Sequence, residues 1–129
     1  MPEIKISSNK RVEFIDITQE VQKIVDSSGI KEGAVLIFTR HTTTGLMINE
    51  NESGLIKDFE NMLKKLVPPN EYLHDRIDNN ADAHLRSVLL NPSIVLPVLN
   101  KRVYLGTWQR IFFVELDGPR NRKVVVKIL

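Results

Sequence analysis

IVLPVLNKRVYLGTWQRIFFVELDGPRNRKVVVKIL (residues 94–129) is the stretch that decides the fold. It divides into short apolar runs over residues 94–99, 103–109, 111–116 and 124–129, and turn-forming residues separate the runs. Runs of this length and composition are typical of β-strands. Three or four strands in succession favour a largely antiparallel sheet.

Two short strands and a helix are predicted in the first 30 residues. Apolar and polar side chains alternate over residues 4–7 and 12–17, and Ser8-Asn9-Lys10 between them is predicted to form a hairpin turn. Apolar residues then recur at helical spacing between Thr18, a suitable N-cap, and Gly29, which suits a left-handed C-cap.

A strand and two further helices are predicted in the middle of the chain. Residues 33–39 form a continuous apolar run, which is typical of a buried strand. Asn51 or Ser53 can cap the next helix, Pro68-Pro69 ends it, and a shorter helix fits residues 82–90. The apolar face of the longer helix, which we expect to lie in the core, consists of Leu55, Ile56, Phe59, Met62, Leu63 and Leu66.

Strands first, helices between and strands last indicate an α+β fold in a single domain spanning residues 1–129. A chain of 129 residues excludes a TIM barrel, which needs about 250 residues. The absence of cysteine excludes disulfides and thiolate metal sites. The N-terminus has no apolar signal core, and no stretch approaches the ~18 apolar residues of a membrane span. We therefore expect a cytoplasmic protein.

The net charge of +2 is too small to imply a nucleic-acid partner, but it is unevenly distributed. Residues 49–82 hold eight acidic and four basic side chains, whereas residues 101–129 hold seven basic and two acidic ones. Arg120, Arg122 and Lys123 form a cluster in the basic part. This cluster is either a solvated hairpin tip or a loop that contacts phosphate.

The chain has only three histidines, His41, His74 and His84, and each lies in a polar stretch. Imidazole is the commonest metal ligand and the usual proton carrier near neutral pH. If the three converge, they form a metal or acid–base site; if they do not, they are surface residues. The spacing matches no standard zinc motif. Nearby carboxylates that could serve as ligands or as acceptors for imidazole N–H groups are Asp75, Asp78 and Asp82.

Thr42, Thr43 and Thr44 directly follow the predicted buried strand. Three hydroxyls at a strand end, together with backbone N–H groups, can bind an anion. The alternative is a threonine-rich turn whose hydroxyls bond to their own backbone. The lysine and glycine spacing of a Walker loop is missing.

Two further side chains stand out in the last third of the chain. Trp108, beside Gln109 and close to Gly106, could stack on a heteroaromatic ring or serve as a core or subunit-interface aromatic. Glu115 lies among apolar neighbours. We expect it to face outward; as a buried acid it would need a partner, and its pKa would rise unless a cation or metal were near.

Five blocks of sequence, in order and over nearly the whole chain, closely resemble the YjbQ family, whose members are often labelled secondary thiamine-phosphate synthase. The blocks are His41 to Glu50, Tyr72 to Asp75, Ala83 to Leu90, Gly106 to Gln109, and Glu115. The family usually repeats His-Asp soon after the Tyr-x-His-Asp block. Here that region contains Asp78 and no second histidine.

The resemblance implies a two-sheet β-sandwich with two to three helices, assembled as a homotrimer whose site lies near subunit contacts. It also implies a divalent metal (zinc, manganese or magnesium) held by His41, His74 and His84. The labelled activity joins a pyrimidine diphosphate to a thiazole phosphate and releases pyrophosphate. Arg86 and the threonine turn could hold phosphate oxygens, and Trp108 could stack on the pyrimidine.

The sequence therefore predicts a metal-dependent enzyme that acts on phosphorylated heterocycles. The alternative is a homotrimer that binds a metal or an anion without catalysis. Nucleic acid is an unlikely partner, because aromatic and basic residues do not interleave near the basic cluster, and no membrane partner is expected. The candidate catalytic residues are His41, Glu50 and Glu115; the candidate substrate ligands are Thr42, Thr43, Thr44, Asn49, Arg86, Trp108 and Gln109.

Overall fold

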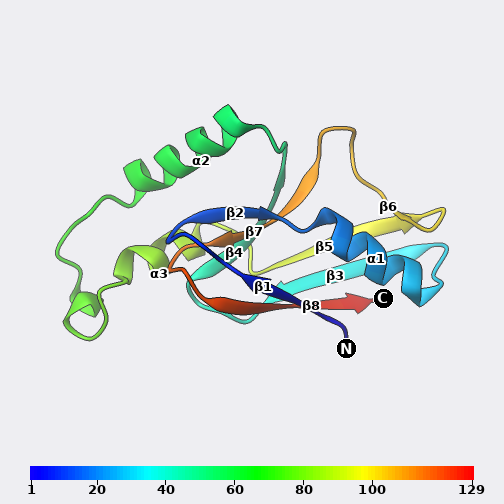
Figure 1. Cartoon of the computed structure of the whole chain (residues 1–129), viewed down its shortest axis with the longest axis horizontal. Coiled ribbons are helices and arrows are strands. Elements are labelled where there is room, and N and C mark those ends of the chain that lie inside the picture. The colour runs from blue at the N-terminus through cyan, green and yellow to red at the C-terminus, as the bar shows by residue number, and fades with distance from the viewer.

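The computed structural model describes all 129 residues as three α-helices, one short 3₁₀ helix and eight strands (Figure 1). The helices are α1 (Thr18–Ser28), α2 (Ser53–Leu66) and α3 (Ala81–Val88), with the 3₁₀ helix η1 at Leu73–Arg76. The strands are β1 (Glu3–Ser7), β2 (Glu13–Asp16), β3 (Gly33–Thr39), β4 (Thr44–Asn49), β5 (Ser93–Leu99), β6 (Arg102–Val103), β7 (Arg110–Glu115) and β8 (Asn121–Ile128).

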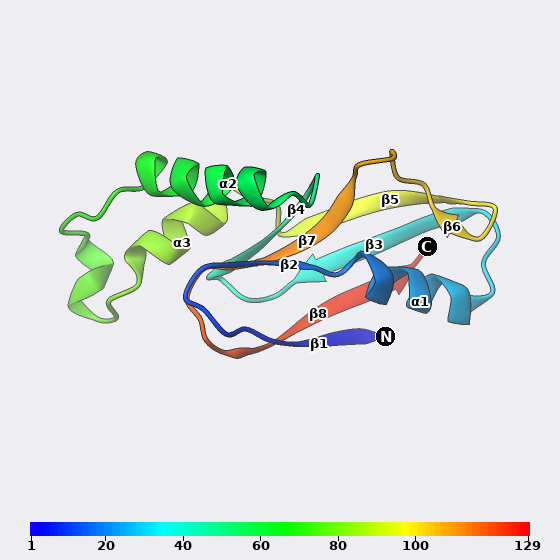
Figure 2. The same ribbon diagram turned by 45° about the horizontal axis from the view of Figure 1, so that its top comes forward.

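The strands form two antiparallel sheets, which confirms the predicted α+β fold with two sheets. The larger sheet has the order β1-β8-β3-β5-β6, and the smaller sheet has the order β2-β7-β4. Helix α1 lies at one end of the molecule, whereas α2 and α3 lie together at the other end (Figure 2).

Strand β7 contributes side chains to two separate hydrophobic clusters, one on each of its faces, because successive side chains of a strand point to opposite faces. Ile111 and Phe113 pack with residues of the larger sheet and of α1. Phe112, Val114 and Leu116 pack instead with α2 and α3. The same alternation directs Glu115 toward the space between the two sheets, where an acidic side chain needs a partner.

The predicted hairpin at Ser8-Asn9-Lys10 is wrong. Strand β1 pairs with β8, whereas β2 pairs with β7. Residues 8–12 therefore carry the chain from one sheet to the other. A turn-like sequence between two short strands could not reveal that each strand has a distant partner.

The predicted strand over residues 103–109 is also largely wrong, since β6 is only two residues long. Asn100 and Lys101 adopt left-handed φ angles of 52° and 67° and close the tight turn between β5 and β6. The following residues form an exposed loop in which Gln109 Oε1 accepts a hydrogen bond of 2.8 Å from the Gly106 N–H.

The predicted helices are present, but two of the expected details are wrong. The carboxylate of Glu52 caps α2 by accepting hydrogen bonds from Gly54 N and Leu55 N, and these bonds lower the pKa of Glu52. Neither Asn51 nor Ser53 is the cap. Met62, expected in the core, is 49% exposed, because only the part of the helix face nearest β7 is covered.

The start and end of α1 differ in how well they follow the prediction. Gly29 has the expected left-handed φ of 72° at the end of the helix. Thr18 is the first residue of α1 and not its cap. Its hydroxyl donates to Asp16 Oδ1 and accepts a hydrogen bond from the Ile111 N–H, so it ties the helix to β7.

Candidate functional site

A polar cleft of ≈ 630 Å³ lies where the β3–β4 loop, the start of α3 and the β7–β8 loop meet. None of its lining residues is hydrophobic. Three arginines line it against two aspartates, so its fixed charges sum to a positive value. The lining residues are Arg40, His41, Thr42, Thr43, Asp78, Asn79, Asn80, His84, Asp117, Arg120 and Arg122.

A buried ion pair between Glu115 of β7 and Arg122 of β8 lies behind this cleft. Arg122 Nη2 is 2.7 Å from Glu115 Oε2, and Arg122 Nε is 2.9 Å from Glu115 Oε1. Glu115 is completely buried, and Arg122 is only 7% exposed. The expectation that Glu115 faces outward is therefore wrong. Its side chain fills the inter-sheet space that the alternation of β7 assigns to it.

Hydrogen bonds keep the Glu115 carboxylate ionised. Burial alone would raise the pKa of Glu115, but hydrogen bonds from Arg122, Ser8 and the Asp117 N–H outweigh it and lower the pKa. The Ser8 hydroxyl donates to Glu115 Oε1 at 2.8 Å. The carboxylate and guanidinium are thus both charged in the folded protein.

His41 lines the cleft with one ring nitrogen already engaged. Its Nε2 accepts a hydrogen bond of 3.1 Å from the Lys123 N–H. Burial and then the charge of Arg122 lower the pKa of His41. A neutral imidazole that accepts at Nε2 carries its proton on Nδ1.

His74 and His84 lie against each other, but only His84 lines the cleft together with His41. Their ring centroids are 4.7 Å apart in an edge-to-face arrangement. His74 Nε2 is buried without a hydrogen-bond partner, as is Asn80 Oδ1.

The three histidines do not form a metal-ligand set in this arrangement. No group of three or more histidine, aspartate or glutamate side chains is placed to hold a metal ion. His41 Nε2 accepts the Lys123 N–H, and the proton on Nδ1 blocks the other nitrogen. In this arrangement His41 therefore has no free lone pair for a metal ion.

The sequence left open whether the three threonines bind an anion or bond within their own turn, and the structure separates Thr42 and Thr43 from Thr44. Thr42 and Thr43 line the cleft, and the Thr43 hydroxyl accepts a hydrogen bond of 2.8 Å from Arg122 Nη2. Thr44 is buried; its hydroxyl donates to the His41 carbonyl and lies 2.7 Å from the Thr39 hydroxyl. Thr44 therefore shapes the turn.

Four candidate residues lie near the end of β7 that is farther from the cleft, and none of them lines it. Asn49 and Glu50 lie at the end of β4 that pairs with Arg110, the first residue of β7, whereas the cleft lies at the other end of that strand. Trp108 is 71% exposed on the loop before Arg110. A second hollow of ≈ 430 Å³ there includes Gln109 in its lining.

Arg86 is a buried structural residue and does not line the cleft. Its Nη2 donates 2.8 Å to the Val67 carbonyl, and its Nη1 lies 3.3 Å from Asp82. Arg11 also holds Asp82, through two hydrogen bonds of 2.9 and 3.0 Å. Arg86 thus links α3 to the residue that follows α2.

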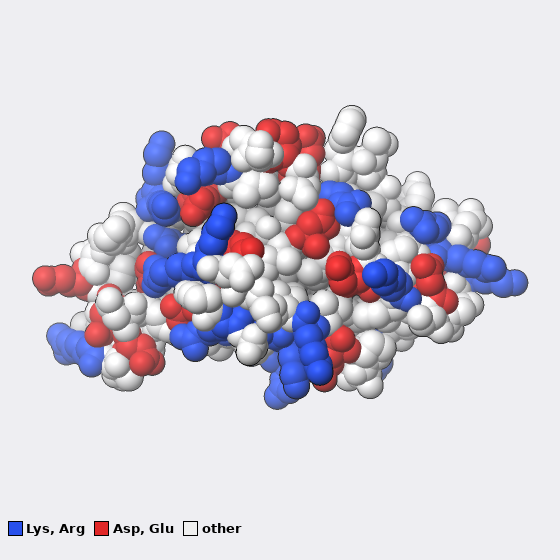
Figure 3. All heavy atoms as spheres, viewed as in Figure 1, with Lys and Arg blue, Asp and Glu red and all other residues white.

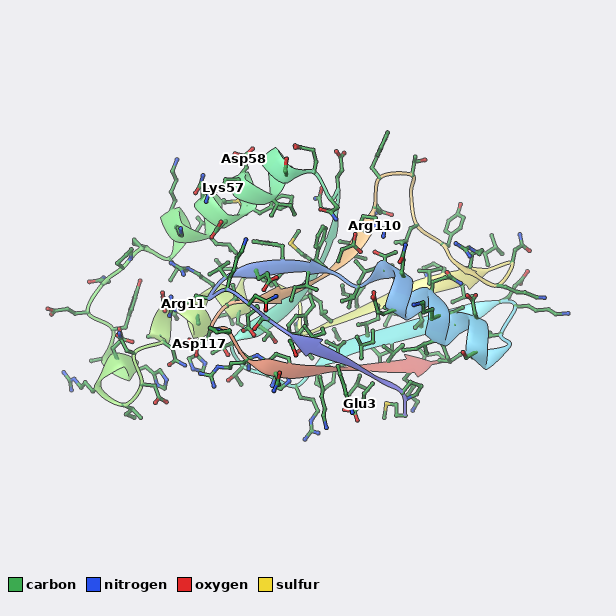
Figure 4. The ribbon with its side chains drawn as sticks, viewed as in Figure 1. Glu3, Arg11, Lys57, Asp58, Arg110 and Asp117 are labelled. Carbon is green, nitrogen blue, oxygen red and sulfur yellow. The ribbon has the colours of Figure 1, made fainter.

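The structure adds functional candidates that the sequence analysis did not assign to the site. Arg40, Asn80 and Asp117 line the cleft together with Arg120 and Arg122. Asp117 Oδ2 accepts hydrogen bonds from Asn80 and Arg120. Figure 4 shows Asp117 close to Arg11 and well separated from Arg110. In the sequence, the cluster of Arg120, Arg122 and Lys123 after Gly118 was the feature that pointed to this site.

Comparison with known proteins places the chain in a family. The family model described as UPF0047 protein YjbQ-like matches residues 2–129. The chain belongs to the YjbQ-like UPF0047 family. It is 52% identical to a UPF0047 protein of Archaeoglobus fulgidus over 128 residues, which are 98% of this chain and 99% of that protein. It is 39% identical to the UPF0047 protein YugU of Bacillus subtilis, across 98% of this chain and 96% of that protein.

Solved structures of relatives have the same fold. A crystal structure of a YbjQ-like protein of unknown function from Sulfolobus solfataricus matches with a TM-score of 0.96 and 43% identity, covering 98% of this chain and 94% of that one. An uncharacterised YjbQ/UPF0047 protein from Clostridium acetobutylicum matches with a TM-score of 0.95 and 39% identity, over the full length of both chains. No helix of the chain is long and apolar enough to cross a membrane.

Proposed function

We propose that the cleft binds the phosphoryl group of a small molecule and that the protein is a transferase acting on phosphorylated heterocycles, with thiamine-phosphate-synthase-like activity. The observation that carries this proposal is the wholly polar lining, which includes Arg40, Arg120 and Arg122 together with His41 and His84. Arginine suits phosphate because its planar guanidinium offers several donors in a fixed geometry.

The reaction needs stabilisation of a leaving anion more than a base. The thiazole nitrogen bonds to the methylene carbon of the pyrimidine, while the bond from that carbon to the diphosphate oxygen breaks. The electron pair leaves with pyrophosphate. Donors fixed around the departing oxygens lower the barrier to such a step, and the arginines of the cleft are donors of this kind.

Turnover of the two phosphorylated precursors tests the proposal. The purified chain is incubated with the pyrimidine diphosphate and the thiazole phosphate, with and without added zinc, manganese or magnesium, and pyrophosphate release is measured. We expect release that falls sharply in Arg120→Ala. Stabilisation by pyrophosphate in thermal unfolding without any turnover would instead support the non-catalytic anion-binding alternative.

Metal dependence stays a prediction that is separate from the proposal that the cleft binds a phosphoryl group. Metal content per chain, measured for the purified protein and for His84→Ala, tests it. A stoichiometric divalent metal that is lost in the variant would require His41, His74 and His84 to rearrange from the geometry described above. Purified protein that contains no bound metal would instead support an anion site that works without a metal ion.

A homotrimer also belongs to the proposal. Large apolar side chains that are at least 38% exposed occur on β3, on β5 and on the loop before β7. Association of copies would cover such side chains. Sedimentation equilibrium of the full chain tests it: a single species of three chains is expected, and a monomer would contradict it. The side chains concerned are Phe38, Val95, Leu99, Tyr104 and Trp108.

Nucleic acid remains an unlikely partner in this proposal. Figure 3 shows basic and acidic side chains mixed over the face drawn, without a continuous basic surface. Arg122 of the basic cluster is buried and paired. A weak affinity for RNA that does not depend on Arg120 is therefore the expected result of a binding assay.

A further inference from the structure

Arg122 has one nitrogen that the protein leaves free. Nε and Nη2 make hydrogen bonds to Glu115 and Thr43, whereas Nη1 makes none. The side-chain nitrogens and oxygens that are both buried and unpartnered belong to His74, Asn80 and Arg86 alone. Nη1 is therefore reached by solvent, and Arg122 is one of the residues that line the cleft.

His41 is arranged in the same way. The Lys123 N–H occupies Nε2, so the neutral ring carries its proton on Nδ1. Nδ1 makes no hydrogen bond within the chain and is not a buried unpartnered atom. Two residues that line the cleft thus each carry a donor without a partner in the chain, and hydrogen bonds at their other nitrogens hold both side chains in place.

We propose that Arg122 Nη1 and the Nδ1–H of His41 form a preorganised oxyanion subsite that binds a terminal phosphate or diphosphate group without a metal ion. This inference rests on the proposed function, because it names the two groups that would hold the phosphoryl oxygens. Glu115 and Thr43 are positioning residues that act through Arg122.

The buried pair makes sense as part of such a subsite. Replacing a buried ion pair by apolar residues of similar volume is often neutral or stabilising, so the pair is weak evidence for a purely structural role. Donors that are held rigidly around an anion stabilise its charge most effectively, because they need no reorganisation when the anion binds. Glu115 and Thr43 supply that rigidity to Arg122.

The subsite also gives His41 a role other than the predicted metal ligand or base. In the tautomer that accepts from the Lys123 N–H, one nitrogen is occupied and the other carries a proton. Such a ring can donate to an anion, but it has no free lone pair for a metal. The role of His41 is therefore that of a neutral hydrogen-bond donor.

Binding of inorganic pyrophosphate, measured by calorimetry in the presence of EDTA, tests the role of Arg122. We expect Arg122→Lys to bind about 10- to 100-fold more weakly, since a hydrogen bond to a charged group is lost although the charge is kept. Arg110→Lys, at the opposite end of β7, is the matched control and should bind as the wild type does. Thr43→Val, which removes one hydrogen bond to Arg122, should weaken binding less than Arg122→Lys.

Two amide substitutions and a spectrum test the role of His41. In His41→Asn the side-chain amide lies near the place of Nδ1 and should retain most of the pyrophosphate affinity. In His41→Gln the amide reaches toward the place of Nε2 and should not. Heteronuclear NMR of the wild-type imidazole, which needs no variant, should show Nδ1 protonated and Nε2 unprotonated.

The outcomes separate this inference from the proposed function. Unchanged affinity in Arg122→Lys, a wild-type His41 protonated at Nε2, or binding that requires a metal would overturn the subsite, even if the heterocycles turn over. Pyrophosphate binding with the expected variant pattern but no turnover would uphold the subsite and overturn the transferase. No pyrophosphate binding by the wild type would overturn the subsite, and the turnover assay would still decide the transferase.

Discussion

The two ends of β7 carry two arginine–carboxylate pairs with nearly the same shortest N–O distance and very different surroundings. At one end, Arg122 and Glu115 are 2.7 Å apart, with side chains 7% and 0% exposed. At the other end, Arg110 and Asp16 are 2.8 Å apart, with side chains 38% and 18% exposed. Figure 4 shows Arg110 far from Asp117, which follows Glu115 closely in the chain.

The N–O distance alone therefore does not determine how much each pair contributes to the free energy of unfolding. Water still reaches the Arg110–Asp16 pair, which is only partly buried, so we expect it to contribute about 1 kcal/mol or less, as surface pairs do. Both buried charges have lost their water, and each depends on the other for compensation. The Glu115–Arg122 pair lies behind the cleft, whereas the Arg110–Asp16 pair lies at the other end of β7.

The largest expected effect comes from breaking the buried pair. Glu115→Ala leaves the guanidinium of Arg122 without its counter-charge in the protein interior, and we expect a loss of about 3–5 kcal/mol in the free energy of unfolding. Arg110→Ala, the matched change at the exposed pair, should cost about 0–1 kcal/mol. Urea unfolding monitored by tryptophan fluorescence and by circular dichroism measures both. Equal losses in the two variants would remove the distinction between the two ends.

The pH dependence of stability sharpens the same comparison. The pKa of Glu115 in the folded protein lies below its ordinary value of 4.5. A lowered carboxyl pKa gives stability that is complete above the unfolded pKa and is lost as the pH falls through the folded pKa. The stability gap between wild type and Glu115→Gln should therefore be largest above pH 4.5 and should narrow as the pH falls below it.

The exposed pair supplies the control for that experiment. Burial would raise the pKa of Asp16, but hydrogen bonds from Arg110, Thr18 and Asn51 lower it below its ordinary value of 3.8. Its contribution should begin to fade only below that pH. For the buried pair, a difference in unfolding free energy between wild type and Glu115→Gln that stays constant from neutral to acid pH would show that Glu115 is not the ionised partner of Arg122.

Periodicity predicted most of the fold and failed where pairing partners decide. The apolar runs located β3, β5, β7 and β8, because alternating or continuous apolar residues reflect burial. The pattern of apolar residues could not show that β1 and β2 enter different sheets, because their partners, β8 and β7, lie far away in the sequence. It also assigned residues 103–109 to a strand, although most of them form an exposed loop.

The site was predicted less completely than the fold. His41, Thr43 and His84 were grouped in the sequence analysis, and all three line the cleft. Arg122 was identified only within a charged cluster, because its burial depends on the Glu115 side chain from another strand. Trp108 and Gln109 were grouped with the histidines on the strength of residue type, whereas the structure places them at the far end of β7.

Arg86 offers an intermediate case, buried like Arg122 but outside the cleft. Arg86→Met keeps most of the side-chain volume and leaves the Val67 carbonyl without its hydrogen bond. We expect a loss of about 1–3 kcal/mol and, in calorimetry, unchanged pyrophosphate binding. Asp82 still has Arg11 as a partner in this variant. Weakened pyrophosphate binding by the folded variant would show that burial of an arginine, and not its place at the cleft, explains the effect of Arg122.

Trp108 should give the smallest effect on the isolated chain and the most informative one on assembly. Its side chain is 71% exposed, and surface substitutions away from special features usually change stability by about 0.5 kcal/mol or less. Trp108→Ala should therefore unfold like the wild type in circular dichroism and bind pyrophosphate with the same affinity. If copies associate through this end of β7, the variant should sediment as a smaller species at equal concentration. A variant that unfolds several kcal/mol more easily as a monomer would show that the exposed end of β7 contributes to the fold as much as the buried end does.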